Sequence, residues 1–131
     1  MVSILVVDNS CSQRRALEAL LSREGYTVRT AASGDEALAR LEKYEVDVLL
    51  CDVSMPTMDG LAVLRHVQAH DAGIAAVMLS GHGDITTAVA AMREGAYDCL
   101  VKPNFASALT SDLKVGEWVV AIAIRLAWVI R

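Results

Sequence analysis

The sequence predicts an α/β domain built around a parallel β-sheet. Five short apolar runs, rich in β-branched residues, alternate along the chain with segments whose apolar residues recur at helical spacing. Strands that alternate with helices form parallel sheets covered on both faces, which explains why these runs are nearly continuous. The chain has 131 residues, 54% hydrophobic and 21% charged, so we expect one folded domain with a core.

The predicted strands are short apolar runs that end in polar residues. They are expected over residues 2–7, 26–31, 46–52, 74–80 and 97–103. The third run, VDVLLCD, is the most apolar. Both the first and the third lead into an acid, Asp8 and Asp52 respectively. Strand ends are usually polar, so one such residue alone indicates little.

The predicted helices lie between these strands, over residues 11–24, 36–44, 61–70 and 85–95. Gly25 closes the first helix as a C-terminal glycine. Ser33 and Glu36 form a capping box at the start of the second. Asp84 is the expected N-cap of the fourth helix and Gly95 its closing glycine.

Five strands joined in this way favour a flavodoxin-like, doubly wound sheet with strand order 2-1-3-4-5. In that topology, ligand sites lie beyond the carboxyl ends of the strands, where the order reverses between the first and third strands. Asp8 and Asn9 follow the first strand, Asp52 ends the third, Ser80 ends the fourth and Lys102 lies near the end of the fifth.

These side chains suit phosphoryl transfer to a carboxylate. A carboxylate can act as a nucleophile and form an acyl phosphate, and a hard cation with oxygen ligands neutralises the transferred group. An ammonium group and a hydroxyl can hold the remaining phosphoryl oxygens. We therefore expect Asp52 to be the acceptor, with Asp8 and Asn9 near the metal and Ser80 and Lys102 on the phosphoryl oxygens.

The motifs VVDN, LLCDVSMPTMDG, MLSGHGD and GAYDCLVKP carry a family resemblance that extends from about residue 3 to Pro103. The sequence resembles the receiver domains of two-component response regulators. The stretch SGHGDITTAVAAMREGAYD most resembles receivers of the nitrogen-regulation, dicarboxylate-transport and nitrogen-fixation type. The resemblance implies a cytoplasmic signalling switch rather than a metabolic enzyme, one that catalyses only its own phosphorylation and dephosphorylation.

The resemblance also implies roles for individual residues. Asp52 would accept a phosphoryl group from the phosphohistidine of a sensor histidine kinase, with Mg²⁺ bound, and the domain would then control an output domain or a partner protein. The residues implied for the metal are Asp8, Asn9, Asp52 and the backbone carbonyl of Ser54. Ser80 would be the switch hydroxyl and Lys102 the phosphate-binding lysine. Control of transcription follows from the subgroup only by analogy.

Three residues near the predicted site depart from the family pattern or modify it. Receivers typically carry two adjacent acids after the first strand, whereas here Asn9 stands at the second position, so the metal site loses one negative charge. An alternative role for Asn9 is to cap the first helix. Cys99 stands where relatives place Tyr or Phe, and its thiol packs as an apolar group or serves as a redox sensor. His82 is either a modulator of dephosphorylation or a solvent-facing loop residue.

Composition excludes several other kinds of site. The net charge of −4 gives no basic face for direct nucleic-acid binding. The three cysteines are widely spaced and form no CxxC pair, so neither a zinc site nor a disulfide framework is expected. His66 and His70 have the spacing of a metal-binding pair, but the sequence offers no third ligand nearby. We therefore assign both histidines to the solvated side of their helix.

The C-terminal segment does not fit the family pattern. We divide the chain into a receiver core over residues 1–114 and an apolar segment over residues 115–131, which forms an atypical fifth helix or an interface or linker helix. A strand is the alternative, because VVAIAI is β-branched. The segment is too short and too interrupted by arginine for a membrane span, and it favours a homodimer.

Two other functions compete with a phosphorylated switch. A degenerate receiver would act as a phosphate-independent interaction module, which Asn9 and Cys99 favour and Asp52, Ser80 and Lys102 oppose. A phosphatase of the haloacid-dehalogenase type also phosphorylates an aspartate, but it requires a second acid two residues later, where this chain has Ser54.

Overall fold

The computed structural model describes residues 2–53, 55, 58–70, 73–80 and 85–101. Its elements alternate in the order β1 (Ser3–Val7), α1 (Cys11–Arg23), β2 (Thr27–Ala31), α2 (Gly34–Lys43), β3 (Val48–Asp52), α3 (Gly60–His70), β4 (Ala75–Ser80), α4 (Ile85–Arg93) and β5 (Asp98–Val101). The strands form one parallel sheet in the order β2-β1-β3-β4-β5. This confirms the predicted flavodoxin-like architecture.

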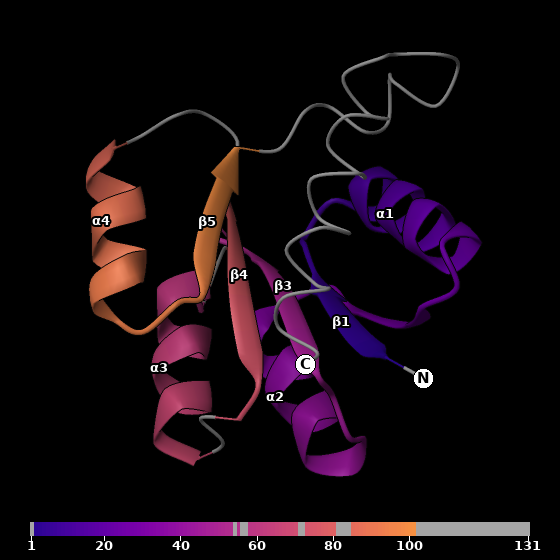
Figure 1. The fold of residues 1–131 in the computed structure, drawn as a ribbon, viewed down its shortest axis with the longest axis horizontal. Coiled ribbons are helices and arrows are strands. Elements are labelled where there is room, and N and C mark those ends of the chain that lie inside the picture. Colours follow the sequence, from indigo (N-terminus) through magenta and orange to yellow (C-terminus); the bar gives the residue numbers. More distant parts are fainter. Residues whose placement is uncertain (1, 54, 56–57, 71–72, 81–84, 102–131) are drawn as a thin grey trace.

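The sheet separates two apolar clusters. On one face, Ile4 and Val6 of β1 pack with side chains of α1. On the other face, Leu5 and Val7 pack with side chains of α2, α3 and α4. Successive residues of a strand point to opposite faces, so one strand supplies both clusters and has to be apolar throughout. Figure 1 shows α1 lying apart from the other three helices, as this division requires.

Local signals begin and end the helices largely as predicted. The Ser33 side chain accepts a hydrogen bond from the Glu36 backbone N–H at 3.2 Å. The Glu36 carboxylate reaches back to the Ala32 N–H at 3.3 Å, which completes a variant of the capping box. Gly25 and Gly95 have φ values of 95° and 99°, so both take the left-handed conformation expected of a closing glycine.

Several predicted features lie outside the described residues. These are the N-cap at Asp84, the fifth helix and the division of the chain at residue 114. Self-association through residues 115–131 therefore also stays a prediction. None of the helices in the described ranges is both long enough and apolar enough to cross a membrane.

Candidate functional site

The carboxyl edge of the sheet gathers the buried polar side chains of the fold. Asp8, directly after β1, is 1% exposed, Asp52 at the end of β3 is 7% exposed, and Ser80 at the end of β4 is 8% exposed. Among the described residues, no other polar or charged side chain is buried to this degree. Carboxylates are seldom buried this deeply, so the gathering of two of them and a hydroxyl at one edge of the sheet favours a functional site.

Strand register brings the two aspartates to the same level. Val7 of β1 is paired with Cys51 of β3. Asp8 directly follows Val7, and Asp52 directly follows Cys51. Ser80 ends the neighbouring strand, one position beyond the residue paired with Asp52. Because β1 pairs with β2 on one side and β3 with β4 on the other, the group lies at the switch point of the sheet.

Hydrogen bonds fix the turn from β1 into α1. The Asp8 carboxylate accepts from the Ser10 backbone N–H at 2.9 Å, and the Asp8 carbonyl accepts from the Arg14 guanidinium at 2.8 Å. Ser10 is the N-cap of α1, since its side chain accepts from the Gln13 N–H at 3.4 Å. The alternative that Asn9 caps this helix is therefore wrong, because Asn9 lies one residue too early and its side chain is exposed beside Asp8.

Gly60 places the start of α3 against the backbone of β3. Its N–H donates to the Val53 carbonyl at 3.0 Å. A Cβ atom built at Gly60 would collide with the Asp52 carbonyl oxygen and approach the Val53 Cα to 2.8 Å. Only glycine permits this approach, and Asp52 is one of the two residues it touches. The backbone conformation at Asp52 and Val53 thus depends on a residue eight positions after Asp52.

Sequence reasoning missed Ser10, Arg14 and Gly60 as parts of this site. A serine directly before a helical pattern is a general cap signal and could have identified Ser10. The contact of Arg14 depends on how α1 is rotated against the sheet. The contact of Gly60 depends on how closely α3 approaches β3. Neither the rotation of α1 nor the approach of α3 to β3 is encoded in the spacing of residues along the sequence.

Only part of the predicted site falls within the described residues. The structure brings together Asp8, Asp52 and Ser80, with Asn9 at the rim. Ser54, His82 and Lys102, which were predicted as metal carbonyl, modulator and phosphate ligand, lie outside the described residues.

The donor set at this edge fits a hard divalent cation. Carboxylate, amide and hydroxyl oxygens are available, and Mg²⁺ prefers oxygen ligands. No cluster of three His, Cys, Asp or Glu side chains suited to a metal ion occurs in the part of the chain that the structure describes. Asp8 and Asp52 supply two carboxylates at this edge, and Asn9 supplies a neutral amide.

Cys99 behaves as an apolar residue. It lies on β5 opposite Met78 of β4 and packs against the cluster on the α3 face. Burial raises the pKa of the Cys99 thiol, and the neighbouring Asp98 carboxylate raises it further. The thiol therefore stays protonated near neutral pH, which favours packing over the redox role. Tyr97, two residues earlier, is 45% exposed.

A flavodoxin-like sheet with buried aspartates at its switch point defines a class of α/β signalling domain. Residues 4–114 match the response regulator receiver domain, and the chain belongs to this family. It is 37% identical over 115 residues to the C4-dicarboxylate transport transcriptional regulatory protein DctD of Rhizobium meliloti. That match covers 88% of this chain and 25% of DctD, so the chain spans about a quarter of the length of this relative.

Solved structures show the same fold. The receiver domain of NtrX from Brucella abortus has a TM-score of 0.73 and 38% sequence identity, covering 88% of this chain and 96% of that one. The response regulator TrrA of Thermotoga maritima, solved in complex with Mg²⁺–BeF, has a TM-score of 0.74 and 26% identity. The match covers 91% of this chain and 96% of TrrA. The predicted family and the likeness to receivers of dicarboxylate-transport and nitrogen-regulation type proteins are confirmed.

Proposed function

We propose that Asp52 accepts a phosphoryl group from a sensor histidine kinase and that the domain then switches conformation to control an output domain or partner. The observation that carries this proposal is the burial of Asp8, Asp52 and Ser80 together at the switch point of the sheet. The likeness to DctD, named as a transcriptional regulator, favours transcription control as the output.

The chemistry assigns a task to each residue. A carboxylate oxygen of Asp52 attacks phosphorus, and the bond from phosphorus to the kinase imidazole nitrogen breaks. Asp8, Asn9, Asp52 and the carbonyl of Ser54 would hold Mg²⁺, which neutralises charge on the phosphoryl oxygens. The Ser80 hydroxyl and the Lys102 ammonium would donate to the same oxygens. The bond from Arg14 to the Asp8 carbonyl keeps the β1–α1 turn in place.

A direct experiment tests this proposal. The chain is incubated with phosphoramidate, with and without MgCl₂, and its intact mass is measured. We expect a gain of one phosphoryl group that requires Mg²⁺. A chain that gains no phosphoryl group under either condition would instead support the second candidate, a phosphate-independent interaction module, which the neutral Asn9 side chain favours.

Replacing Asn9 by aspartate is expected to raise the affinity for Mg²⁺ on the order of tenfold, because it returns a charged oxygen ligand beside Asp8. Asn9 is exposed, so the change should fit without repacking. Calorimetric titration with MgCl₂ measures the effect, and Asn9→Ala serves as the control that removes the amide oxygen. Equal affinities in all three proteins would place residue 9 outside the metal's ligand set.

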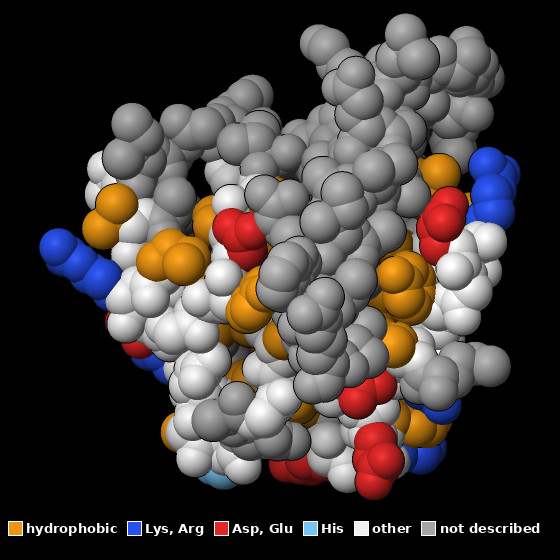
Figure 2. All heavy atoms as spheres, in the orientation of Figure 1, with side chains coloured by type: hydrophobic (Ala, Val, Ile, Leu, Met, Phe, Trp, Pro, Cys, Tyr) orange, Lys and Arg blue, Asp and Glu red, His pale blue; other side chains and the backbone are white. Residues whose placement is uncertain are grey.

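We propose that the switch acts through Ser80 and the segment that follows it. Attraction of the Ser80 hydroxyl to the phosphoryl group would shift the balance between two conformations of residues 81–84 and the start of α4. Near this route, Val89, Met92 and Tyr97 are 43%, 49% and 45% exposed. Figure 2 shows hydrophobic side chains on the surface over α4. A shift of α4 would therefore move apolar side chains, Val89 and Met92, that stand on the surface.

Cys99→Tyr is expected to change the switching equilibrium by less than about fivefold, the lower end of typical allosteric coupling. The reason is that Cys99 is a partly buried residue packed against the core, while the proposed route runs through Ser80. Hydrogen exchange of the α4 amides, with and without phosphoramidate, measures the switch, and Cys99→Ser is the control that adds no ring. A much larger gain for Cys99→Tyr alone would show that an aromatic ring at this position drives the switch.

A further inference from the structure

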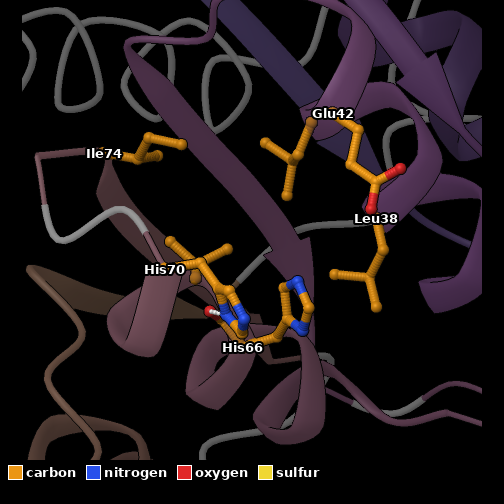
Figure 3. A pocket seen from close by; sticks show the side chains of 7 residues that line it. Leu38, Glu42, His66, His70 and Ile74 are labelled. Carbon is orange, nitrogen blue, oxygen red and sulfur yellow. Dashed lines mark hydrogen bonds between the residues drawn. The ribbon is translucent and has the colours of Figure 1, made fainter.

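A pocket of about 320 Å³ lies between α2 and α3, far from Asp52. Both helices run back from the carboxyl edge of the sheet, so their last turns lie at its opposite edge. The side chains lining the pocket are Leu38, Leu41 and Glu42 of α2, His66, Val67 and His70 of α3, and Ile74 before β4. Figure 3 shows the two imidazole rings side by side at this pocket, with Glu42 extending from the facing helix.

The two histidines are arranged as a pair. Their ring centroids are 4.1 Å apart and the ring planes differ by 17°. His70 Nδ1 lies 2.9 Å from the His66 carbonyl oxygen. A carbonyl oxygen only accepts hydrogen bonds, so Nδ1 of His70 carries the hydrogen. In the neutral ring the lone pair is then on Nε2.

Two features of this pair are shared with metal-binding histidines, namely the spacing of four residues on one helix face and the hydrogen bond made by the second ring nitrogen of His70. Such a histidine usually donates its other ring N–H to a carbonyl or carboxylate, which fixes the ring and its tautomer. Two nitrogen ligands on one tetrahedral Zn²⁺ lie about 3.3 Å apart, given Zn–N distances of about 2.0–2.1 Å. In the stacked arrangement the lone pairs lie in nearly parallel ring planes, so both rings have to turn toward a common point before they bind one ion. The apolar side chains of Leu38, Val67 and Ile74 line the rest of the pocket.

Glu42 of α2 lines the same pocket as the two histidines and offers a third donor group from another helix. Its side chain is exposed, so rotation toward the histidines costs little. Within the described ranges, no three His, Cys, Asp or Glu side chains lie close enough together in this structure to bind one ion. The third ligand therefore has to move when the ion binds.

We propose that His66 and His70 chelate a divalent transition-metal ion, Zn²⁺, Ni²⁺ or Cu²⁺, and that Glu42 closes on the same ion from α2. The site is separate from the edge that carries Asp52 and takes a different class of cation. Imidazole nitrogens suit these ions, whereas Mg²⁺ selects oxygen ligands. Binding ties the last turns of α2 and α3 together.

Calorimetric titration of the full chain with NiCl₂, ZnCl₂ and CuCl₂, in excess MgCl₂, tests the site. We expect one equivalent to bind. Cu²⁺ should bind most tightly, because it has the highest affinity of the divalent first-row metals for a given nitrogen and oxygen site. His66→Gln and His70→Gln should each weaken binding by at least about tenfold. Glu42→Gln should weaken it several-fold, and the matched control Glu18→Gln, an exposed acid on α1, should leave it unchanged.

Competing ligands elsewhere in the chain are tested in parallel. Cys11→Ser, His82→Asn and Asp52→Asn should each retain the wild-type affinity for Ni²⁺. Nitrogen hyperfine coupling in the electron paramagnetic resonance spectrum of the Cu²⁺ complex should be lost in the His66→Gln/His70→Gln double variant. Three results would overturn the proposal. They are unchanged affinity in that double variant, loss of affinity in Cys11→Ser or His82→Asn, and no binding by the wild type at about 100 µM metal, a concentration near the dissociation constants of weak extracellular Ca²⁺ modules.

Discussion

Asp52→Asn is expected to abolish phosphorylation by phosphoramidate. The amide that replaces the carboxylate is neutral and a poor nucleophile, so no acyl phosphate can form at this position. The same change removes one of the two buried carboxylates from the proposed metal site and should lower Mg²⁺ affinity as well. Intact-mass measurement gives the extent of phosphorylation, and titration with MgCl₂ gives the affinity.

Asp35→Asn is the matched control for this change. Asp35 lies in the first turn of α2 and is exposed, so its replacement alters the total charge equally without touching the site. We expect this variant to be phosphorylated like the wild type. A phosphoryl group that still appears on Asp52→Asn, and maps to another acid, would show that the acceptor has been assigned to the wrong residue.

Gly60→Ala is expected to destabilise the fold by about 3 kcal/mol, the upper range for forced overpacking. The added methyl group meets the backbone at Asp52 and Val53, and backbone atoms cannot turn aside as the end of a flexible side chain can. Relief of the clash has to displace the end of β3 or the start of α3. Urea unfolding measures the loss, and the rate of phosphorylation should fall with it because Asp52 moves.

Gly25→Ala separates this steric effect from backbone conformation. Gly25 has a φ of 95°, but a Cβ atom there has nothing within 4 Å. Its replacement should therefore cost only the strain of the left-handed conformation, about 1 kcal/mol, and leave phosphorylation intact. If Gly60→Ala proved as mild as Gly25→Ala, the close approach of α3 to β3 would not constrain the acceptor segment.

The sequence by itself determined the order of elements and the edge of the sheet on which the site lies. The apolar runs that end at Val7, Asp52 and Ser80 predict buried parallel strands, because only such strands are covered on both faces. Once the strands are parallel, their carboxyl ends meet at one edge, and the favoured order 2-1-3-4-5, which the structure confirms, places Asp8 and Asp52 at the ends of neighbouring strands. Hydrophobic periodicity and chain connectivity suffice for these conclusions.

Only the tertiary structure decided which side chains from separate elements touch. The bond of Arg14 to the Asp8 carbonyl, the approach of Gly60 to Asp52, and the placing of Glu42 across a pocket from His66 all depend on how each helix is rotated and how closely it packs. Local spacing shows which face of a helix is apolar. The position of that face against the sheet is set by the fit of all the packed side chains at once.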